Sequence, residues 1–321
     1  MEPLAPGMRR IGKVMRHLPG SSVARATPEE IARNSGASAP ELMASILMGV
    51  RPKGVRTEDR TEAGLRLRIY TPEGQATSRP LVVYFHGGGF VFGDLRGGDW
   101  ICGTVARDLD AIVVSVDYRL APKFPFPAGV DDSYAGLVWA TDHANDLGAD
   151  AERLGVMGES AGGNLAAVVA LIARDNGGPV VGHQALLYPV TGADDTESRR
   201  ANADAFILTA ADMKKFDELY AGDRNDWRVS PLKARSLSGL PPALIAVAGH
   251  DPLHDDGVLY ADALRAAAVD VQLIEYPAMP HGFLNFPRFA RDAKPAIAAV
   301  VAAQRSALQA RSSPPPAKVH D

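Results

Sequence analysis

The sequence has little of several features that assign proteins to special classes. It holds one cysteine in 321 residues, so no disulfide can form within the chain and a reducing cytoplasm is the expected location. No apolar run approaches the ~20 residues of a membrane span, and no apolar segment follows the first basic residues, so we expect neither a span nor a secretory signal. The net charge is -4, without the strongly basic balance that typifies nucleic-acid-binding proteins.

The sequence is rich in short apolar runs that alternate with helical stretches. Strands are predicted at Leu65–Tyr70, Leu81–Phe85, Ile112–Val116, Leu154–Met157, Ala185–Tyr188, Ala243–Ala248 and Val271–Tyr276. Helices are predicted at Asp131–Asn145, Ala161–Arg174, Val258–Ala268 and Lys294–Gln309. This alternation predicts an α/β fold with a mostly parallel sheet flanked by helices.

Two regions interrupt the alternation. Residues 1–50 contain helical fragments but no clear strand, and residues 191–236 contain charged and turn-forming residues with a helical piece near Ala210–Tyr220. Ordinary loops are far shorter than these segments. We therefore expect both to form a helical lid, or cap, over a core built from residues 51–190 and 237–311. The proline-rich residues 312–321 are predicted to be a disordered tail.

Two glycine-rich motifs predict nucleophilic chemistry. The first is Gly158-Glu159-Ser160-Ala161-Gly162, which follows a predicted strand and precedes an apolar helix. Glycines on both sides of a serine permit the sharp turn that exposes its hydroxyl. The second is His86-Gly87-Gly88-Gly89, which directly follows another predicted strand. Its backbone can approach a substrate oxygen closely and donate hydrogen bonds to it. We expect Ser160 to be a nucleophile and the N–H group of Ala161 to be one oxyanion donor.

A serine nucleophile needs a base and an acid that orients the base. His281 follows the last predicted strand and comes late in the chain, as the order serine, acid, histidine requires. His86 is interpreted as bracing its glycine loop instead. Asp251 closely follows the strand at 243–248 and is the predicted acid. Asp255 and Asp256 are nearby rivals that should point elsewhere because they fall within the next helical turn.

The cluster of histidines and aspartates at residues 250–256 also raises a metal hypothesis. His250 and His254 are four residues apart, and histidines at that spacing can share a metal on one helix. Pro252 lies between them and is expected to open the helix, which leaves His250 outside it. We therefore predict no metal site. No phosphate-binding glycine motif is present, so no nucleotide cofactor is expected.

In these motifs the chain resembles the hormone-sensitive-lipase-like esterases of the α/β-hydrolase fold. The resemblance covers about residues 60–305 and includes Asp117-Tyr118-Arg119-Leu120-Ala121-Pro122 and His281-Gly282-Phe283 besides the motifs above. It implies a catalytic triad of Ser160, Asp251 and His281 and an oxyanion hole formed by the N–H groups of Gly88, Gly89 and Ala161. It also implies a cap and raises a homodimer formed through a sheet edge as a hypothesis. Glu159, His254 and Asp256 depart from the usual family residues.

The resulting prediction is a serine carboxylesterase that hydrolyses short- to medium-chain acyl esters through an acyl-enzyme, without a cofactor. A small-molecule ester is then the expected partner. Phe90, Phe92, Leu208 and Phe283 are the predicted lining of an apolar pocket, with a role as packing residues as the alternative. Amide or lactone hydrolysis by the same triad remains open. So does a ligand-binding protein on an inactive hydrolase scaffold.

Overall fold

The computed structural model describes residues 2–15, 22–35, 47–76 and 78–309. Its centre is an eight-stranded sheet with the order β1-β2-β4-β3-β5-β6-β7-β8. Strand β2 is antiparallel to both of its neighbours, and every other pairing is parallel. The strands are β1 Val55–Glu62, β2 Leu65–Pro72, β3 Arg79–Phe85, β4 Ile112–Asp117, β5 Ala149–Glu159, β6 Val181–Leu187, β7 Ala243–His250 and β8 Val271–Pro280.

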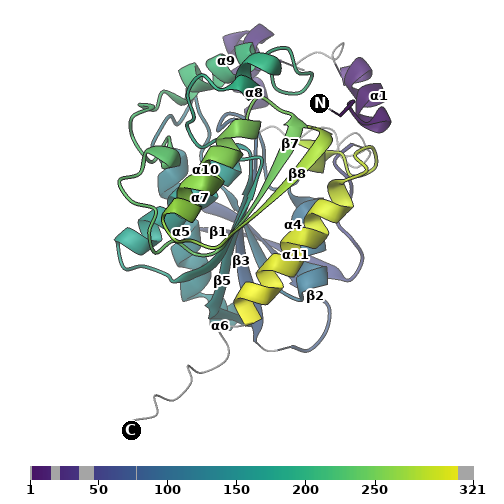
Figure 1. The fold of residues 1–321 in the computed structure, drawn as a ribbon. Coiled ribbons are helices and arrows are strands. Elements are labelled where there is room, and N and C mark those ends of the chain that lie inside the picture. Colours follow the sequence, from purple (N-terminus) through teal and green to yellow (C-terminus); the bar gives the residue numbers. More distant parts are fainter. Residues whose placement is uncertain (1, 16–21, 36–46, 77, 310–321) are drawn as a thin grey trace.

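Helices cover both faces of this sheet, as Figure 1 shows. Helices α5 (Ala128–Asp142), α7 (Ala161–Asp175) and α10 (His254–Ala266) pack on one face. Helices α4 (Asp99–Leu109) and α11 (Ala293–Gln309) pack on the other. Because both faces are covered, the central strands are apolar along nearly their whole length, and β3 is buried at almost every position. Short α6 (Ala144–Leu147) precedes β5.

The remaining helices lie near the carboxyl ends of β7 and β8 (Figure 1). They are α1 Pro6–Met15, η1 Val23–Arg25, α2 Pro28–Asn34, α8 Glu197–Ala201 and α9 Ala210–Tyr220. The short η3 Phe283–Asn285 closely follows the end of β8, whereas η2 Pro231–Lys233 contacts α7 and α10. Thr27 and Thr209 begin α2 and α9 as capping boxes, each satisfying backbone N–H groups that a helix start leaves free. The carboxyl ends of parallel strands are where sites form in open α/β sheets.

Every strand and helix predicted from the alternation is present, with ends that differ by several residues. The strand predicted at Leu154–Met157 runs from Ala149 to Glu159. The pattern does not predict β1, which is an edge strand of mostly charged residues with little buried surface. It also does not predict α4. The expected disordered tail lies outside the described residues.

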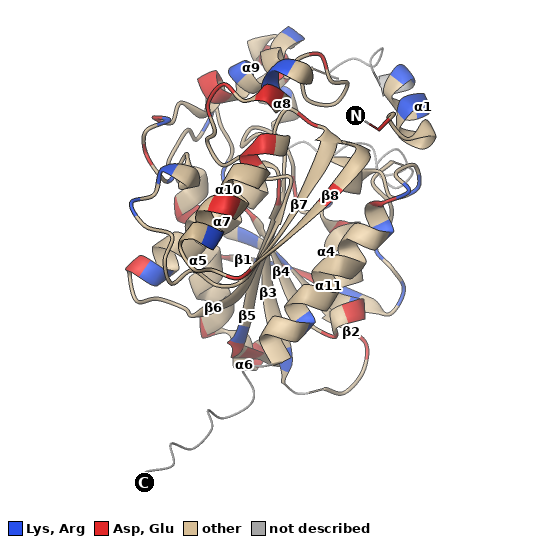
Figure 2. Ribbon diagram, in the orientation of Figure 1, with Lys and Arg blue, Asp and Glu red and all other residues tan. Residues whose placement is uncertain are grey.

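Charges of both signs are interspersed over the elements in Figure 2, in keeping with the small net charge. In the part of the chain that the structure describes, no helix has both the length and the apolar character needed to cross a bilayer.

Candidate active site

Ser160 lies at a sharp turn between β5 and α7. Its backbone has a φ of 55° and a ψ of −118°, a strained conformation for a residue with a side chain. A Cβ atom on Gly158 would overlap the carbonyl oxygen of Gly162, and a Cβ atom on Gly162 would overlap the carbonyl oxygen of Phe85. The two glycines therefore let the strand and the helix meet closely enough to hold Ser160 at the apex of the turn.

A continuous chain of hydrogen bonds links Ser160 to two residues far along the sequence. The Nε2 atom of His281 lies 2.9 Å from the Oγ atom of Ser160. Its Nδ1 atom lies 2.7 Å from the Oδ2 atom of Asp251. The Asp251 carboxylate is fully buried, and its Oδ1 atom accepts a hydrogen bond from the backbone N–H of Leu253. Because the aspartate holds Nδ1, the Nε2 atom faces the hydroxyl and can accept its proton.

The glycine loop after β3 borders the same place. Gly88 and Gly89 have positive φ angles of 120° and 62°, and both line the cavity above Ser160 with Ala161. The N–H groups of these three residues donate to no acceptor within the described ranges. The Nδ1 atom of His86 contacts the carbonyl oxygen of Gly87 at 2.8 Å, and its ring stacks on the Tyr118 ring.

Glu159, the residue before the nucleophile candidate, holds a buried polar cluster under the site. Its carboxylate accepts hydrogen bonds from the hydroxyl of Tyr84 at 3.1 Å, the hydroxyl of Tyr188 at 2.7 Å and the amide of Asn285 at 2.9 Å. Burial raises the pKa of both phenols, and the nearby carboxylate adds to the shift, so both remain donors. The Tyr188 ring packs edge-on against the His281 ring at 5.0 Å. Nothing in the sequence signals this cluster, because its members come from four separate segments.

The cavity above Ser160 has a volume of about 390 Å³. Phe90 and Leu208 line it as predicted, but Phe92 and Phe283 do not. Phe92 packs against Phe216, and Phe283 is fully buried between two tyrosine rings. Their prediction as lining residues is therefore corrected to their alternative role in packing. Other lining residues come from both interrupting segments and include Leu47, Met48, Arg199, Ile207, Met213, Phe216 and Arg224.

The other titratable groups near Asp251 point away from the hydroxyl. His250 ends β7 and contacts the carbonyl oxygen of Glu2, whereas His254 begins α10 and contacts Asp255. Asp256 is fully buried and pairs with Arg199 at 2.8 Å. Over the residues that the structure describes, no group of three or more His, Cys, Asp or Glu side chains has the geometry to hold a metal ion.

Known proteins match this chain over most of its length. Residues 82–285 match the family described as the alpha/beta hydrolase fold. Carboxylesterase NlhH of Mycobacterium tuberculosis is 44% identical over 268 residues, which cover 80% of this chain and 84% of that protein. The ethyl acetate hydrolase of Pseudomonas putida is 37% identical over 256 residues, with coverages of 76% and 79%.

A solved structure, the hyperthermophilic esterase of the archaeon Pyrobaculum calidifontis, has a TM-score of 0.83 and 35% identity. The alignment covers 97% of this chain and all of that structure (100%). The fold, the order of the motifs along the chain and the relatives all indicate the same family. The chain belongs to the α/β-hydrolase fold family, and within it to the hormone-sensitive-lipase-like esterases.

Proposed function

We propose that this carboxylesterase works through Ser160 as nucleophile, His281 as general base and Asp251 as the acid that orients the base. The observation that carries the proposal is the unbroken path of 2.9 Å and 2.7 Å contacts from the hydroxyl to the buried carboxylate. His281 takes the hydroxyl proton as Ser160 attacks the ester carbonyl carbon. The Asp251 carboxylate fixes the imidazole tautomer and stabilises the imidazolium that forms.

The backbone N–H groups of Gly88, Gly89 and Ala161 form the oxyanion hole in this proposal. They border the cavity beside Ser160 and donate to no acceptor among the described residues. Ala161 is also the first residue of α7, and the positive end of a helix dipole favours negative charge. Each such donor contributes about 10²–10³ in kcat in other enzymes.

The reaction then runs in two steps. The tetrahedral intermediate collapses as His281 protonates the departing alcohol, and the acyl group stays on the Ser160 oxygen. A water molecule gives a proton to His281 and attacks the acyl carbonyl. The acid leaves, and Ser160 regains its proton from the same imidazole.

Short- to medium-chain acyl esters are the proposed substrates. The cavity of about 390 Å³ has mostly apolar walls, which suits an acyl chain of a few carbons. The name of the Pseudomonas relative, ethyl acetate hydrolase, concerns an ester of this size. Rates on a ladder of p-nitrophenyl esters from acetate to palmitate test this proposal. We expect a maximum below about ten acyl carbons, because longer chains exceed such a volume; a steady rise towards palmitate contradicts it.

The direct test of the mechanism is Ser160→Ala. We expect the variant to fold as the wild type does, with an unchanged circular dichroism spectrum, and to lose turnover on every ester. The structure gives the reason: no side chain of the described cavity other than Ser160 has its oxygen in reach of the His281 Nε2 atom. Retained turnover in a pure preparation removes the serine mechanism.

Residues 1–50 and 191–236 together form the cap in our proposal. Three contacts support it: Ser22 donates to Asp212 at 2.6 Å, the N–H of Ala24 donates to the same carboxylate, and Gly12 packs against the Phe206 ring. Burial alone would raise the pKa of Asp212, but the hydrogen bonds outweigh burial and lower it. Deleting residues 1–35 should therefore lower kcat/KM while the Ser160 hydroxyl still reacts with a small phosphonate.

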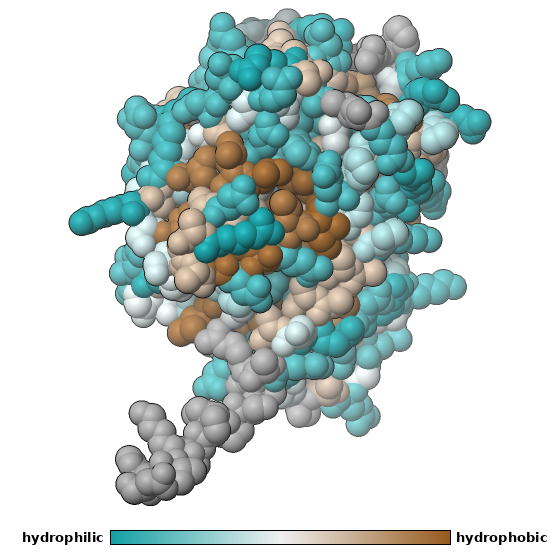
Figure 3. Space-filling view, viewed as in Figure 1, coloured by the Kyte–Doolittle hydropathy of each residue, from teal (hydrophilic) through white to brown (hydrophobic). Residues whose placement is uncertain are grey.

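Dimerisation through the sheet edge at β8 is also proposed. Figure 3 shows an apolar area on the face that carries α10 and β8, where the Leu259 side chain is 43% exposed. An edge strand offers unpaired backbone groups to a second copy. Sedimentation of the wild type and of Leu259→Glu tests this, with a dimer expected for the wild type and a monomer for the variant.

We further propose a cytoplasmic location, since the single Cys102 is a buried free thiol.

A further inference from the structure

The proposed acid Asp251 begins a tight turn, the acid turn, which comprises residues 251–256 and leads from β7 into α10. The Asp251 side chain is held by His281 and by the backbone N–H of Leu253. The backbone N–H and carbonyl groups of the turn also need hydrogen-bond partners. The first N–H groups of a helix have no acceptor within it. The N–H of His254 donates to the carbonyl oxygen of Asp251 inside the turn, but the N–H of Asp255 and the carbonyl oxygen of Pro252 have their partners in another part of the chain.

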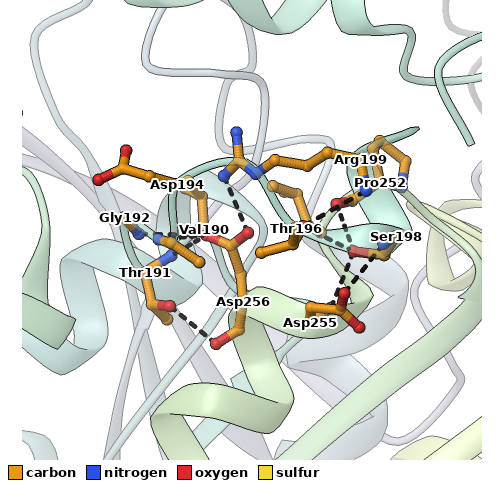
Figure 4. Close-up of polar contacts among 12 residues, drawn as sticks. Val190, Thr191, Gly192, Asp194, Thr196, Ser198, Arg199, Pro252, Asp255 and Asp256 are labelled. Carbon is orange, nitrogen blue, oxygen red and sulfur yellow. Dashed lines mark hydrogen bonds and ion pairs between the residues drawn. The ribbon is translucent and has the colours of Figure 1, made fainter. Parts of the chain in front are cut away.

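Helix α8 of the insertion supplies these partners, as Figure 4 shows. The Ser198 hydroxyl donates to the carbonyl oxygen of Pro252 at 3.0 Å and accepts from the N–H of Asp255 at 3.1 Å. The N–H of Ser198 in turn donates to the Asp255 carboxylate at 2.9 Å. One turn further on, the Asn202 amide donates to the carbonyl oxygen of Asp251 itself at 3.3 Å.

The far end of the acid turn is fixed by an ion pair between the buried Asp256 carboxylate and the partly exposed Arg199. The Asp256 carboxylate accepts hydrogen bonds from the N–H groups of Thr191, Gly192 and Ala193 and from the Arg199 guanidinium. Burial raises the pKa of Asp256, while Arg199 and these N–H groups oppose the shift. Asp256 thus ties the start of the insertion to α10, and this holds α8 against the acid turn (Figure 4).

We propose that Ser198 is a positioning residue that acts through Asp251. Its hydroxyl is at once a donor to one end of the acid turn and an acceptor from the other, and no aliphatic side chain can replace both functions. Ser198 is buried and does not line the cavity, so its role is to keep the Asp251 carboxylate aimed at the His281 Nδ1 atom. The inference rests on the proposed catalytic roles of Asp251 and His281.

The first experiment compares Ser198→Ala with a matched control, Ser133→Ala. Ser133 is also a buried serine that donates to a backbone carbonyl oxygen, that of Gly129 at 2.7 Å, but it lies in α5. With kcat expressed per phosphonate-titrated active site, we expect Ser198→Ala to lose about tenfold to 10²-fold in kcat, because small misplacements of catalytic groups cost that much. KM should change less than about twofold, since Ser198 does not line the cavity. The control should keep wild-type kinetics.

A double-mutant cycle separates positioning from general destabilisation. In an Asp251→Asn background the carboxylate is already lost, so adding Ser198→Ala should cost less than about twofold in kcat. Wild-type kcat in Ser198→Ala, or equal costs in both backgrounds, overturns the proposal. Should Ser198→Ala fail to fold, Asn202→Ala enters the same cycle in its place. Failure of the catalytic proposal itself is distinguishable, because Asp251→Asn alone, with Ser198 unchanged, would then keep the kcat of the wild type.

Discussion

Replacing Glu159 with glutamine tests the buried polar cluster beneath Ser160. The Glu159 carboxylate accepts from three donors, two of them at Oε2. A glutamine keeps its oxygen for Tyr188 and Asn285 and turns its NH₂ group towards Tyr84. The Tyr84 hydroxyl then loses its acceptor in a fully buried place. Hydrogen bonds to charged groups contribute roughly 1.5–3 kcal/mol each, so we expect about 2 kcal/mol lower free energy of unfolding.

The assay is urea unfolding followed by tryptophan fluorescence, with Glu58→Gln as the control. Glu58 pairs with Arg60 on the surface, and its side chain is 60% exposed. Exposed ion pairs contribute ~0–1 kcal/mol, so the control should unfold almost as the wild type does. Equal free energies of unfolding for Glu159→Gln and Glu58→Gln would show that the buried donors around Glu159 do not depend on its charge. Glu159→Ala should be worse than glutamine, since it leaves all three donors without an acceptor.

Two further predictions concern backbone space and pH. Gly162→Ala should prevent folding, because its Cβ atom would overlap the Phe85 carbonyl oxygen, whereas Gly97→Ala should fold, because its Cβ atom would meet only ordinary contacts at 3.5 Å; yields of folded protein decide this. Burial lowers the pKa of His183 to about 4, so protonation of its imidazole favours the unfolded chain. The free energy of unfolding of the wild type should therefore fall by roughly 2 kcal/mol between pH 7 and pH 5 through this group. His183→Gln should lack this fall, and equal pH dependence of unfolding in the two proteins contradicts the prediction.

Much of the site follows from the order of the residues along the chain. Ser160 stands between an apolar strand and an apolar helix, and His281 and Asp251 each follow a strand. Because parallel strands end at one edge of a sheet, such positions converge whatever the intervening sequence. The positions of these three residues relative to one another can therefore be predicted from the order of strands and helices in the sequence.

The direction in which a side chain points is harder to predict from the sequence. Phe92 and Phe283 have the apolar character of pocket residues, yet the half-buried Phe92 packs against Phe216 and Phe283 is fully buried between tyrosine rings. A residue type does not tell which way its side chain faces. The partners of Glu159 and Ser198 come from segments far apart in the sequence, so no local pattern marks them. The sequence pattern does not predict helix α4 for another reason. Ile101, Thr104 and Val105 are β-branched, and packing on the sheet overrides the preference of such residues for strands.

Covalent labelling shows whether Ser160 is the nucleophile of the reaction. The wild type and Ser160→Ala are treated with a p-nitrophenyl alkylphosphonate, digested, and mapped by mass spectrometry while esterase activity is followed. We expect one adduct per chain on the peptide that contains Ser160, loss of activity in step with labelling, and no adduct in Ser160→Ala. An adduct on another residue, or full activity after complete labelling of Ser160, would contradict this role of Ser160.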